Sequence, residues 1–227
     1  MERLICEPEA LPRTAAERIA VALSEAVRAR GGASLALAGG TTPRACYEIL
    51  ATRSDLPWNQ VSIYFGDERA VAPDHPDSNF RMARESLLDR VPIPESQIHR
   101  MAAESADRDA AAQAYAELLP AAIDVMILGI GEDGHTASLF PGSEAALEMT
   151  RLVLPVTGPK PPLLRLTLGP RALLGAQVRF VLASGSGKAT AVKAALEGEI
   201  DVKSCPAQLA RDSVWLLDPG AASGLKS

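Results

Sequence analysis

The residues best suited to acid/base chemistry lie in a glycine-rich segment that follows an apolar run. The segment reads Gly129-Ile130-Gly131-Glu132-Asp133-Gly134-His135. Of the three histidines in the chain, only His135 stands among glycines at the end of a predicted strand. Because glycines let the backbone turn sharply, we expect Asp133 and His135 to be held in a cleft. An imidazole placed there can take up and return a proton near neutral pH; a structural histidine is the alternative.

The same segment contains the spacing G-x-G-x-x-G, which is typical of dinucleotide-binding turns. Such a turn needs a long helix after it and an acid at the end of the next strand. Phe140-Pro141-Gly142 interrupts the chain soon after the glycines, and the next predicted strand, 152–156, does not end in an acid. We therefore expect no dinucleotide cofactor.

A second glycine turn, Gly39-Gly40-Thr41-Thr42, separates a predicted strand, 34–38, from a helix that we expect to start near Pro43. Thr42 is placed to cap that helix. Free backbone N–H groups and the positive end of a helix dipole suit a phosphate, and the two threonines add hydroxyl donors. The alternative is a plain turn between a strand and a helix.

Charged side chains follow two further predicted strands and interrupt a third. Gly66-Asp67-Glu68-Arg69 comes after strand 61–65. We expect Arg69 to bind an anionic group of the substrate, and Asp67 or Glu68 to position Arg69 or to contact sugar hydroxyls. The alternative is an exposed loop whose charges pair with one another. Arg165 interrupts an otherwise apolar strand, and could instead point outward from an edge strand. Lys188 lies in the turn Ser184–Lys188, where a cation opposes the helix dipole unless an anion is near. This turn fails the Walker pattern, so ATP is not expected.

Short apolar segments alternate with longer amphipathic ones along the whole chain. Such alternation predicts a single-domain, Rossmann-like α/β fold over residues 1–227, with a largely parallel sheet covered by helices on both faces. Thr14 to Glu17 reads as a capping box for the first helix. Because ligands of such sheets bind at the carboxyl ends of the strands, we expect the residues above to share one site. The predicted strands are 34–38, 61–65, 124–129, 152–156, 163–168, 178–183 and 213–217, and the later helices are 78–90, 106–119 and 186–197.

Composition and net charge limit the classes of ligand and partner that this chain is expected to bind. The 227 residues carry 23 Lys and Arg against 28 Asp and Glu, a net charge of -5, which argues against nucleic acid but not against a small anion in a local basic pocket. Neither a signal peptide nor a membrane-spanning stretch is predicted. The three cysteines are too few and too scattered for disulfides, which favours a cytoplasmic protein. The histidines lack metal-ligand spacing, so we expect no metal.

Several strings in this order resemble the 6-phosphogluconolactonase family. They are Leu37 to Pro43 (LAGGTTP), Phe65 to Arg69 (FGDER) with Asp77-Ser78-Asn79, Leu128 to Gly142 (LGIGEDGHTASLFPG), Arg165-x-Thr167 and Gly187-Lys188. The resemblance extends from about Pro12 to Asp218. It implies hydrolysis of 6-phospho-D-glucono-1,5-lactone to 6-phospho-D-gluconate in the oxidative pentose phosphate pathway, with no cofactor, by a monomer or small homo-oligomer.

The resemblance also implies roles for residues. His135 would take a proton from the attacking water and return one to the leaving ring oxygen, with Asp133 or Asp67 orienting the imidazole. The substrate would be bound by Gly39, Gly40, Thr41, Thr42, Glu68, Arg69 and Lys188. Arg165 is added to this set from its place in a predicted strand and not from the resemblance.

Two alternatives stay open. A glucosamine-6-phosphate deaminase of the same superfamily would have an aromatic residue in place of Arg69 and a glutamate shortly after the histidine, where this chain has Ser138-Leu139-Phe140-Pro141. A non-catalytic sugar-phosphate sensor would bind the ligand but would be indifferent to His135→Ala.

Overall fold

Six parallel strands form the main sheet of the computed structural model, which describes residues 1–226. Their order across the sheet is β1-β9-β8-β5-β2-β3. All five residues of β2 are buried, as expected for a strand covered on both faces. The strands are β1 (Glu2–Ile5), β2 (Ala33–Leu37), β3 (Val61–Phe65), β5 (Val125–Gly129), β8 (Val178–Ala183) and β9 (Val214–Leu217). The predicted largely parallel α/β sheet is confirmed.

The order of the strands reverses between β2 and β5. β2 pairs with β5 at Leu35↔Val125, while β3 lies on the other side of β2 and β8 on the other side of β5. The chain therefore leaves the carboxyl ends of β2 and β5 in opposite directions and opens a crevice, which is where ligands bind in sheets of this kind. The two glycine turns of the sequence, after Leu37 and after Leu128, meet at this crevice.

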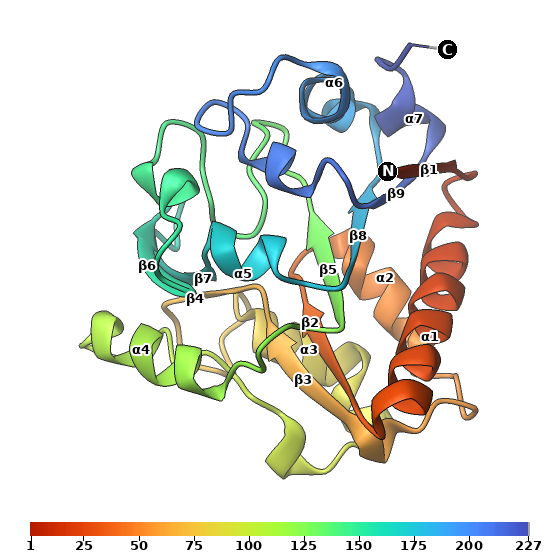
Figure 1. Ribbon diagram of the computed structural model, residues 1–227, viewed down its shortest axis with the longest axis vertical. Coiled ribbons are helices and arrows are strands. Elements are labelled where there is room, and N and C mark those ends of the chain that lie inside the picture. Colours follow the sequence, from red (N-terminus) through yellow and green to blue (C-terminus); the bar gives the residue numbers. More distant parts are fainter. Residues whose placement is uncertain (227) are drawn as a thin grey trace.

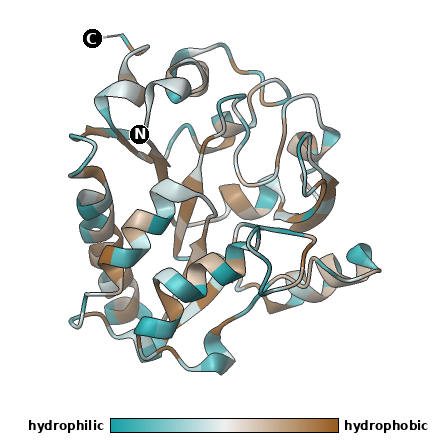
Figure 2. Ribbon diagram, turned by 180° about the vertical axis from the view of Figure 1, so that it is seen from behind, coloured by the Kyte–Doolittle hydropathy of each residue, from teal (hydrophilic) through white to brown (hydrophobic). Residues whose placement is uncertain are grey.

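Helices cover the sheet. α1 and α2 pack against each other and against the main sheet, and α4 and α5 lie on the opposite side in Figure 1. The central strands are mostly apolar and the helices carry polar outer faces (Figure 2). None of these helices, among residues 1–226, has the length and apolar content to cross a membrane. The helices are α1 (Leu11–Arg30), α2 (Thr41–Leu50), α3 (Asn79–Ser86), α4 (Arg108–Leu118), α5 (Pro170–Leu174), α6 (Ala189–Glu197) and α7 (Pro219–Ala222).

A second, antiparallel sheet corrects the expected place of two strands. β4 (Asp67–Arg69), β7 (Leu164–Leu168) and β6 (Val153–Thr157) form it in that order. The strands predicted at 152–156 and 163–168 are therefore not in the main sheet. Their connection is too short for the crossover that parallel strands need, so they pair as a hairpin. β7 is the central strand, and Arg165 is 9% exposed, which also overturns the alternative of an outward-pointing edge arginine.

Two predicted helix starts are wrong by a few residues. α1 begins at Leu11, with Pro12 in its first turn, a position that proline favours. Thr14 consequently lies inside the helix, where its hydroxyl donates to the carbonyl of Ala10 instead of forming a capping box. α2 begins at Thr41 with Gly40 as its N-cap residue, so Thr42 is helical and caps nothing.

Candidate functional site

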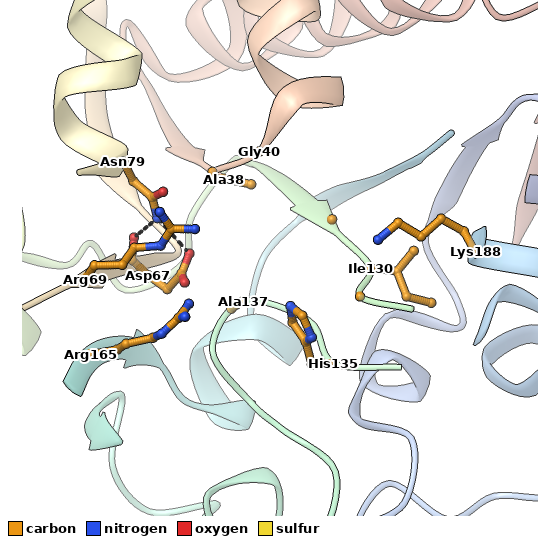
Figure 3. Close-up of a pocket in the computed structure, with 13 residues that line it drawn as sticks. Ala38, Gly40, Asp67, Arg69, Asn79, Ile130, His135, Ala137, Arg165 and Lys188 are labelled. Carbon is orange, nitrogen blue, oxygen red and sulfur yellow. Dashed lines mark hydrogen bonds between the residues drawn. The ribbon is translucent and has the colours of Figure 1, made fainter. Parts of the chain in front are cut away.

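A pocket of about 200 Å³ lies at the carboxyl ends of β2 and β5. Figure 3 shows Asp67, Arg69, Asn79 and Arg165 on one side of it, Lys188 on the other, and His135 between them. The pocket thus gathers residues from both glycine turns and from the second sheet. It is lined by Ala38, Gly39, Gly40, Asp67, Arg69, Asn79, Gly129, Ile130, Gly131, His135, Ala137, Arg165 and Lys188.

His135 is held by the carboxylate two residues before it. Asp133 Oδ1 lies 2.6 Å from His135 Nδ1 and accepts the backbone N–H of His135 at 3.1 Å. Partial burial raises the pKa of Asp133, but the His135 backbone N–H and imidazole outweigh it and hold that pKa below its ordinary value. Asp133 is therefore ionised at neutral pH and fixes the proton on Nδ1. Nε2 is left as the nitrogen that can exchange a proton with a ligand.

Two glycines make room for this pair. A Cβ on Gly131 would fall 2.0 Å from His135 Nδ1, so any side chain there would displace the imidazole. Gly134 has φ +90°, a conformation that only glycine adopts readily. The loop is closed by hydrogen bonds from the Gly131 N–H to the His135 carbonyl at 2.8 Å and from the Thr136 hydroxyl to the Gly129 carbonyl at 2.9 Å. The glycines thus let Asp133 pack against His135. Of the two residues that we expected in a cleft, His135 lines the pocket, and Asp133 supports it without lining the pocket itself.

The two arginines of the pocket come from neighbouring antiparallel strands. Arg69 of β4 and Arg165 of β7 are directly opposite in the strand register. Arg69 Nη1 donates to the carbonyl of Asp77 at 2.6 Å, and the Arg165 guanidinium lies 5.4 Å from the centre of the Phe140 ring. Burial lowers the pKa of Arg165, and Asp67 opposes that shift. The arrangement presents two cations on one side of the pocket.

Asp67 lines the pocket but makes no hydrogen bond to His135. Its Oδ2 accepts the Ser138 hydroxyl at 2.6 Å, and its Oδ1 and backbone carbonyl accept Asn79 Nδ2 at 3.2 and 2.8 Å. Of the two acids that the sequence left open as partners of the imidazole, Asp133 is the one in contact with it. Asp67 instead joins β4 to α3 and to the loop after His135.

Glu68 points away from the pocket and into the start of α3. Its buried carboxylate accepts the backbone N–H groups of Asn79 and Phe80, each at 2.8 Å, and the hydroxyl of Ser78 at 3.0 Å. Burial raises the pKa of Glu68, and these backbone N–H groups oppose the shift. A carboxylate at a helix N-terminus accepts hydrogen bonds from the N–H groups that have no partner within the helix. By binding these groups, Glu68 fixes the start of α3 and therefore the position of Asn79.

The first glycine turn contributes its backbone to the pocket. Gly39 and Gly40 line it, whereas Thr41 and Thr42, in the first turn of α2, do not. Gly40 has φ +104°, and a Cβ on Gly39 would fall 2.1 Å from Asn79 Oδ1. Both glycines are therefore needed for the shape of this wall.

Lys188 ends the 3₁₀ turn η5 (Ser186–Lys188) and is the residue before α6. The turn is anchored by Asp218, which accepts the Ser184 hydroxyl at 2.6 Å and the Gly185 N–H at 2.8 Å. Lys188 lines the pocket across from the two arginines.

Asn79 and Ser138 are site residues to which sequence reasoning assigned no role. Both belong to strings that carried the resemblance, Asp77-Ser78-Asn79 and the segment after His135. The signal was present in their position next to charged residues, but hydrogen bonds to Asp67 across 12 and 71 residues are visible only in three dimensions. Among residues 1–226, no three His, Cys, Asp or Glu side chains are grouped so as to ligate a metal ion.

Comparisons with known proteins agree on one family. The family model described as glucosamine-6-phosphate isomerases/6-phosphogluconolactonase matches residues 6–216. The 6-phosphogluconolactonase of Mycobacterium tuberculosis is 40% identical over 97% of this chain and 96% of its own length. The structure of 6-phosphogluconolactonase from Trypanosoma brucei superposes with a TM-score of 0.88 at 30% identity, covering 99% of this chain and 98% of that one. A monomeric glucosamine-6-phosphate deaminase also reaches 0.88, at 26% identity, over 99% of this chain and all of that one. This chain belongs to the glucosamine-6-phosphate isomerase/6-phosphogluconolactonase family.

Proposed function

We propose that this chain hydrolyses 6-phospho-D-glucono-1,5-lactone to 6-phospho-D-gluconate, a step of the oxidative pentose phosphate pathway. The observation that carries the proposal is the His135–Asp133 pair, 2.6 Å apart, in a pocket that also holds three cationic side chains. An imidazole with one nitrogen engaged by a carboxylate is suited to general base catalysis. The cations suit a phosphorylated substrate, and the names of the most similar relatives support the lactone as that substrate.

In the proposed mechanism, His135 Nε2 takes a proton from a water molecule as its oxygen attacks the lactone carbonyl carbon. The imidazolium that forms is stabilised by the ionised Asp133. The tetrahedral intermediate then collapses, the bond between the carbonyl carbon and the ring oxygen breaks, and His135 returns the proton to that oxygen. The product carries a new carboxyl group and a free hydroxyl, and the enzyme regains its starting protonation.

The phosphate of the substrate is proposed to be bound by cationic side chains of the pocket. Arg69, Arg165 and Lys188 are the candidates, together with the backbone N–H groups of the Gly39–Gly40 turn at the start of α2. A bound phosphate distant from the reacting carbon would align that carbon with His135, which converts binding free energy into orientation. Thr41, Thr42 and Glu68 would act through backbone geometry, since none of them lines the pocket.

The reaction is proposed to take place in the cytoplasm, with the chain as a monomer or small homo-oligomer. Three free cysteines, two of them buried, support a reducing compartment. Light scattering of the purified chain measures the oligomeric state directly.

The test is the rate of acid release from freshly prepared 6-phospho-D-glucono-1,5-lactone above the spontaneous background. We expect a large acceleration by the wild type and its loss in His135→Ala, while His99→Gln, which alters a histidine outside the pocket, keeps the activity. Circular dichroism checks that the variants are folded. A folded wild type without acceleration contradicts the proposal, and ammonia release from glucosamine 6-phosphate then tests the deaminase. Tight binding that is unaffected by His135→Ala, without turnover, would indicate a sensor.

A further inference from the structure

The side chain of Asn79 is held in one orientation at the wall of the pocket. It is 3% exposed, and it occupies the first position of α3. Its Nδ2 donates to both the carbonyl and the carboxylate of Asp67. Because an amide nitrogen only donates and both Asp67 oxygens only accept, the nitrogen must face Asp67. The amide oxygen, Oδ1, then faces the Gly39–Gly40 turn, as Figure 3 shows.

Asn79 Oδ1 is an acceptor without a donor. Within residues 1–226, no N–H or O–H group is hydrogen-bonded to it, although Nδ2 of the same side chain makes two bonds. The oxygen packs closely against Gly39, since a Cβ on Gly39 would fall 2.1 Å from it. It is not among the fully buried unpaired polar atoms of residues 1–226, so it is open to the pocket that Asn79 lines. Water can pair with an oxygen that is open to the pocket, but a ligand that displaces this water loses affinity unless it brings a donor of its own. The geometry therefore indicates that a ligand supplies the donor.

The chemistry of the substrate identifies that donor. A phosphate dianion and a lactone carbonyl present only acceptor oxygens, which Oδ1 would repel. The hydroxyl groups on the sugar ring are the remaining polar groups, and each can donate one hydrogen bond. Resting on the function proposed above, we propose that Asn79 Oδ1 accepts a hydrogen bond from a ring hydroxyl of the phosphorylated lactone. Asn79 thus determines specificity for a hydroxylated sugar.

The test compares kcat/KM of the wild type and of Asn79→Ala on the parent lactone and on its 2-deoxy, 3-deoxy and 4-deoxy analogues. We expect the wild type to use one analogue about tenfold less well than the parent, which is the size of one hydrogen bond. Asn79→Ala should use that analogue and the parent equally well, within twofold. For the other two analogues, the ratio to the parent should be the same in both enzymes.

Ser138→Ala is the matched control, because it removes the other side-chain hydrogen bond to Asp67 and leaves Asn79 in place. It should keep the wild-type preference among the four substrates. If Asn79→Ala lowers kcat/KM equally for all four, or if the wild type does not discriminate among them, the proposal is wrong and Asn79 only holds Asp67. If Asn79→Ala does not fold, Asn79→Ser replaces it. Failure of the proposed function itself would show separately, as a wild type inactive on the parent lactone.

Discussion

Replacing Gly131 with alanine tests whether catalysis depends on the geometry of the His135–Asp133 pair. The φ of Gly131 is one that alanine can adopt, since this residue is not among those with positive φ. The added Cβ, however, would fall 2.0 Å from His135 Nδ1 and 2.3 Å from Cε1. The substitution therefore acts on the imidazole and on Asp133 while the backbone is spared.

The size of the effect follows from the displacement. Ordinary van der Waals contact begins at 3.4 Å, so the imidazole must retreat by about 1.4 Å. A misplacement of about 1 Å in a catalytic group lowers the rate by about 10²-fold, which corresponds to about 3 kcal/mol in the activation free energy. We expect kcat of Gly131→Ala to fall by about this factor, with a much smaller change in KM because the cationic side chains stay in place.

The assay is steady-state acid release from the lactone, with thermal melting to confirm folding. Gly32→Ala is the control, since a Cβ there would meet only the Gln60 carbonyl at 3.5 Å, and we expect its kcat to match the wild type. A folded Gly131→Ala protein with kcat within threefold of the wild type would refute the reasoning that the present position of His135 is required.

Two further predictions concern the walls of the pocket. Lys188→Ala should raise KM for the lactone about tenfold or more with little change in kcat, because a distant cation binds the substrate without taking part in the reaction. Equal losses in kcat for Lys188→Ala and His135→Ala would contradict this division of roles. Burial raises the pKa of Asp218, but the Ser184 hydroxyl and the Ala221 and Gly185 N–H groups lower it more, so it lies below its ordinary value of 3.8. The ionised form thus stabilises the fold above that pH, and its contribution is lost as the pH falls through the lowered pKa. Asp218→Asn should reduce the free energy of unfolding by about 1–3 kcal/mol at pH 7. Urea unfolding should show this difference shrinking as the pH falls below the ordinary value of 3.8, and a difference independent of pH would contradict this.

Most strands of the main sheet can be predicted because buried strands consist mainly of small and apolar residues. A short run of small and apolar residues between turn signals, as in β2, is typical of a strand that is covered on both faces. β1 (Glu2–Ile5) escapes prediction, since it is short, lies at the edge and has exposed ends. The hairpin of β6 and β7 is assigned to the wrong sheet because an apolar strand looks the same in either pairing. The short connection 158–163 is the usable signal, since it allows only antiparallel pairing.

The candidate site can be predicted where chemistry is local and not where it depends on distant contacts. Asp133 and His135 are two residues apart, so a turn brings them together. The direction in which Glu68 points depends on the position of α3, which approaches from 11 residues further along the chain. Sequence alone likewise leaves Asp67 and Asp133 as equal partners for the imidazole, because the Ser138 and Asn79 contacts that engage Asp67 are long-range.

The buried place of Arg165 in the pair of β4 and β7 also limits how stable this protein can become. Arg69 and Arg165 face each other across that pair, and like charges in directly opposite positions destabilise a sheet; the charge of Arg69 indeed contributes to the lowered pKa of Arg165. Asp67 outweighs this repulsion, and burial of the Arg165 guanidinium is the largest cause of the lowered pKa. The cost to the fold is therefore chiefly that of removing the charge from water. Selection for heat resistance alone would favour a neutral residue at position 165, and the same change would weaken the attraction for an anion. A thermostable variant of this fold that keeps both arginines must therefore gain its stability elsewhere.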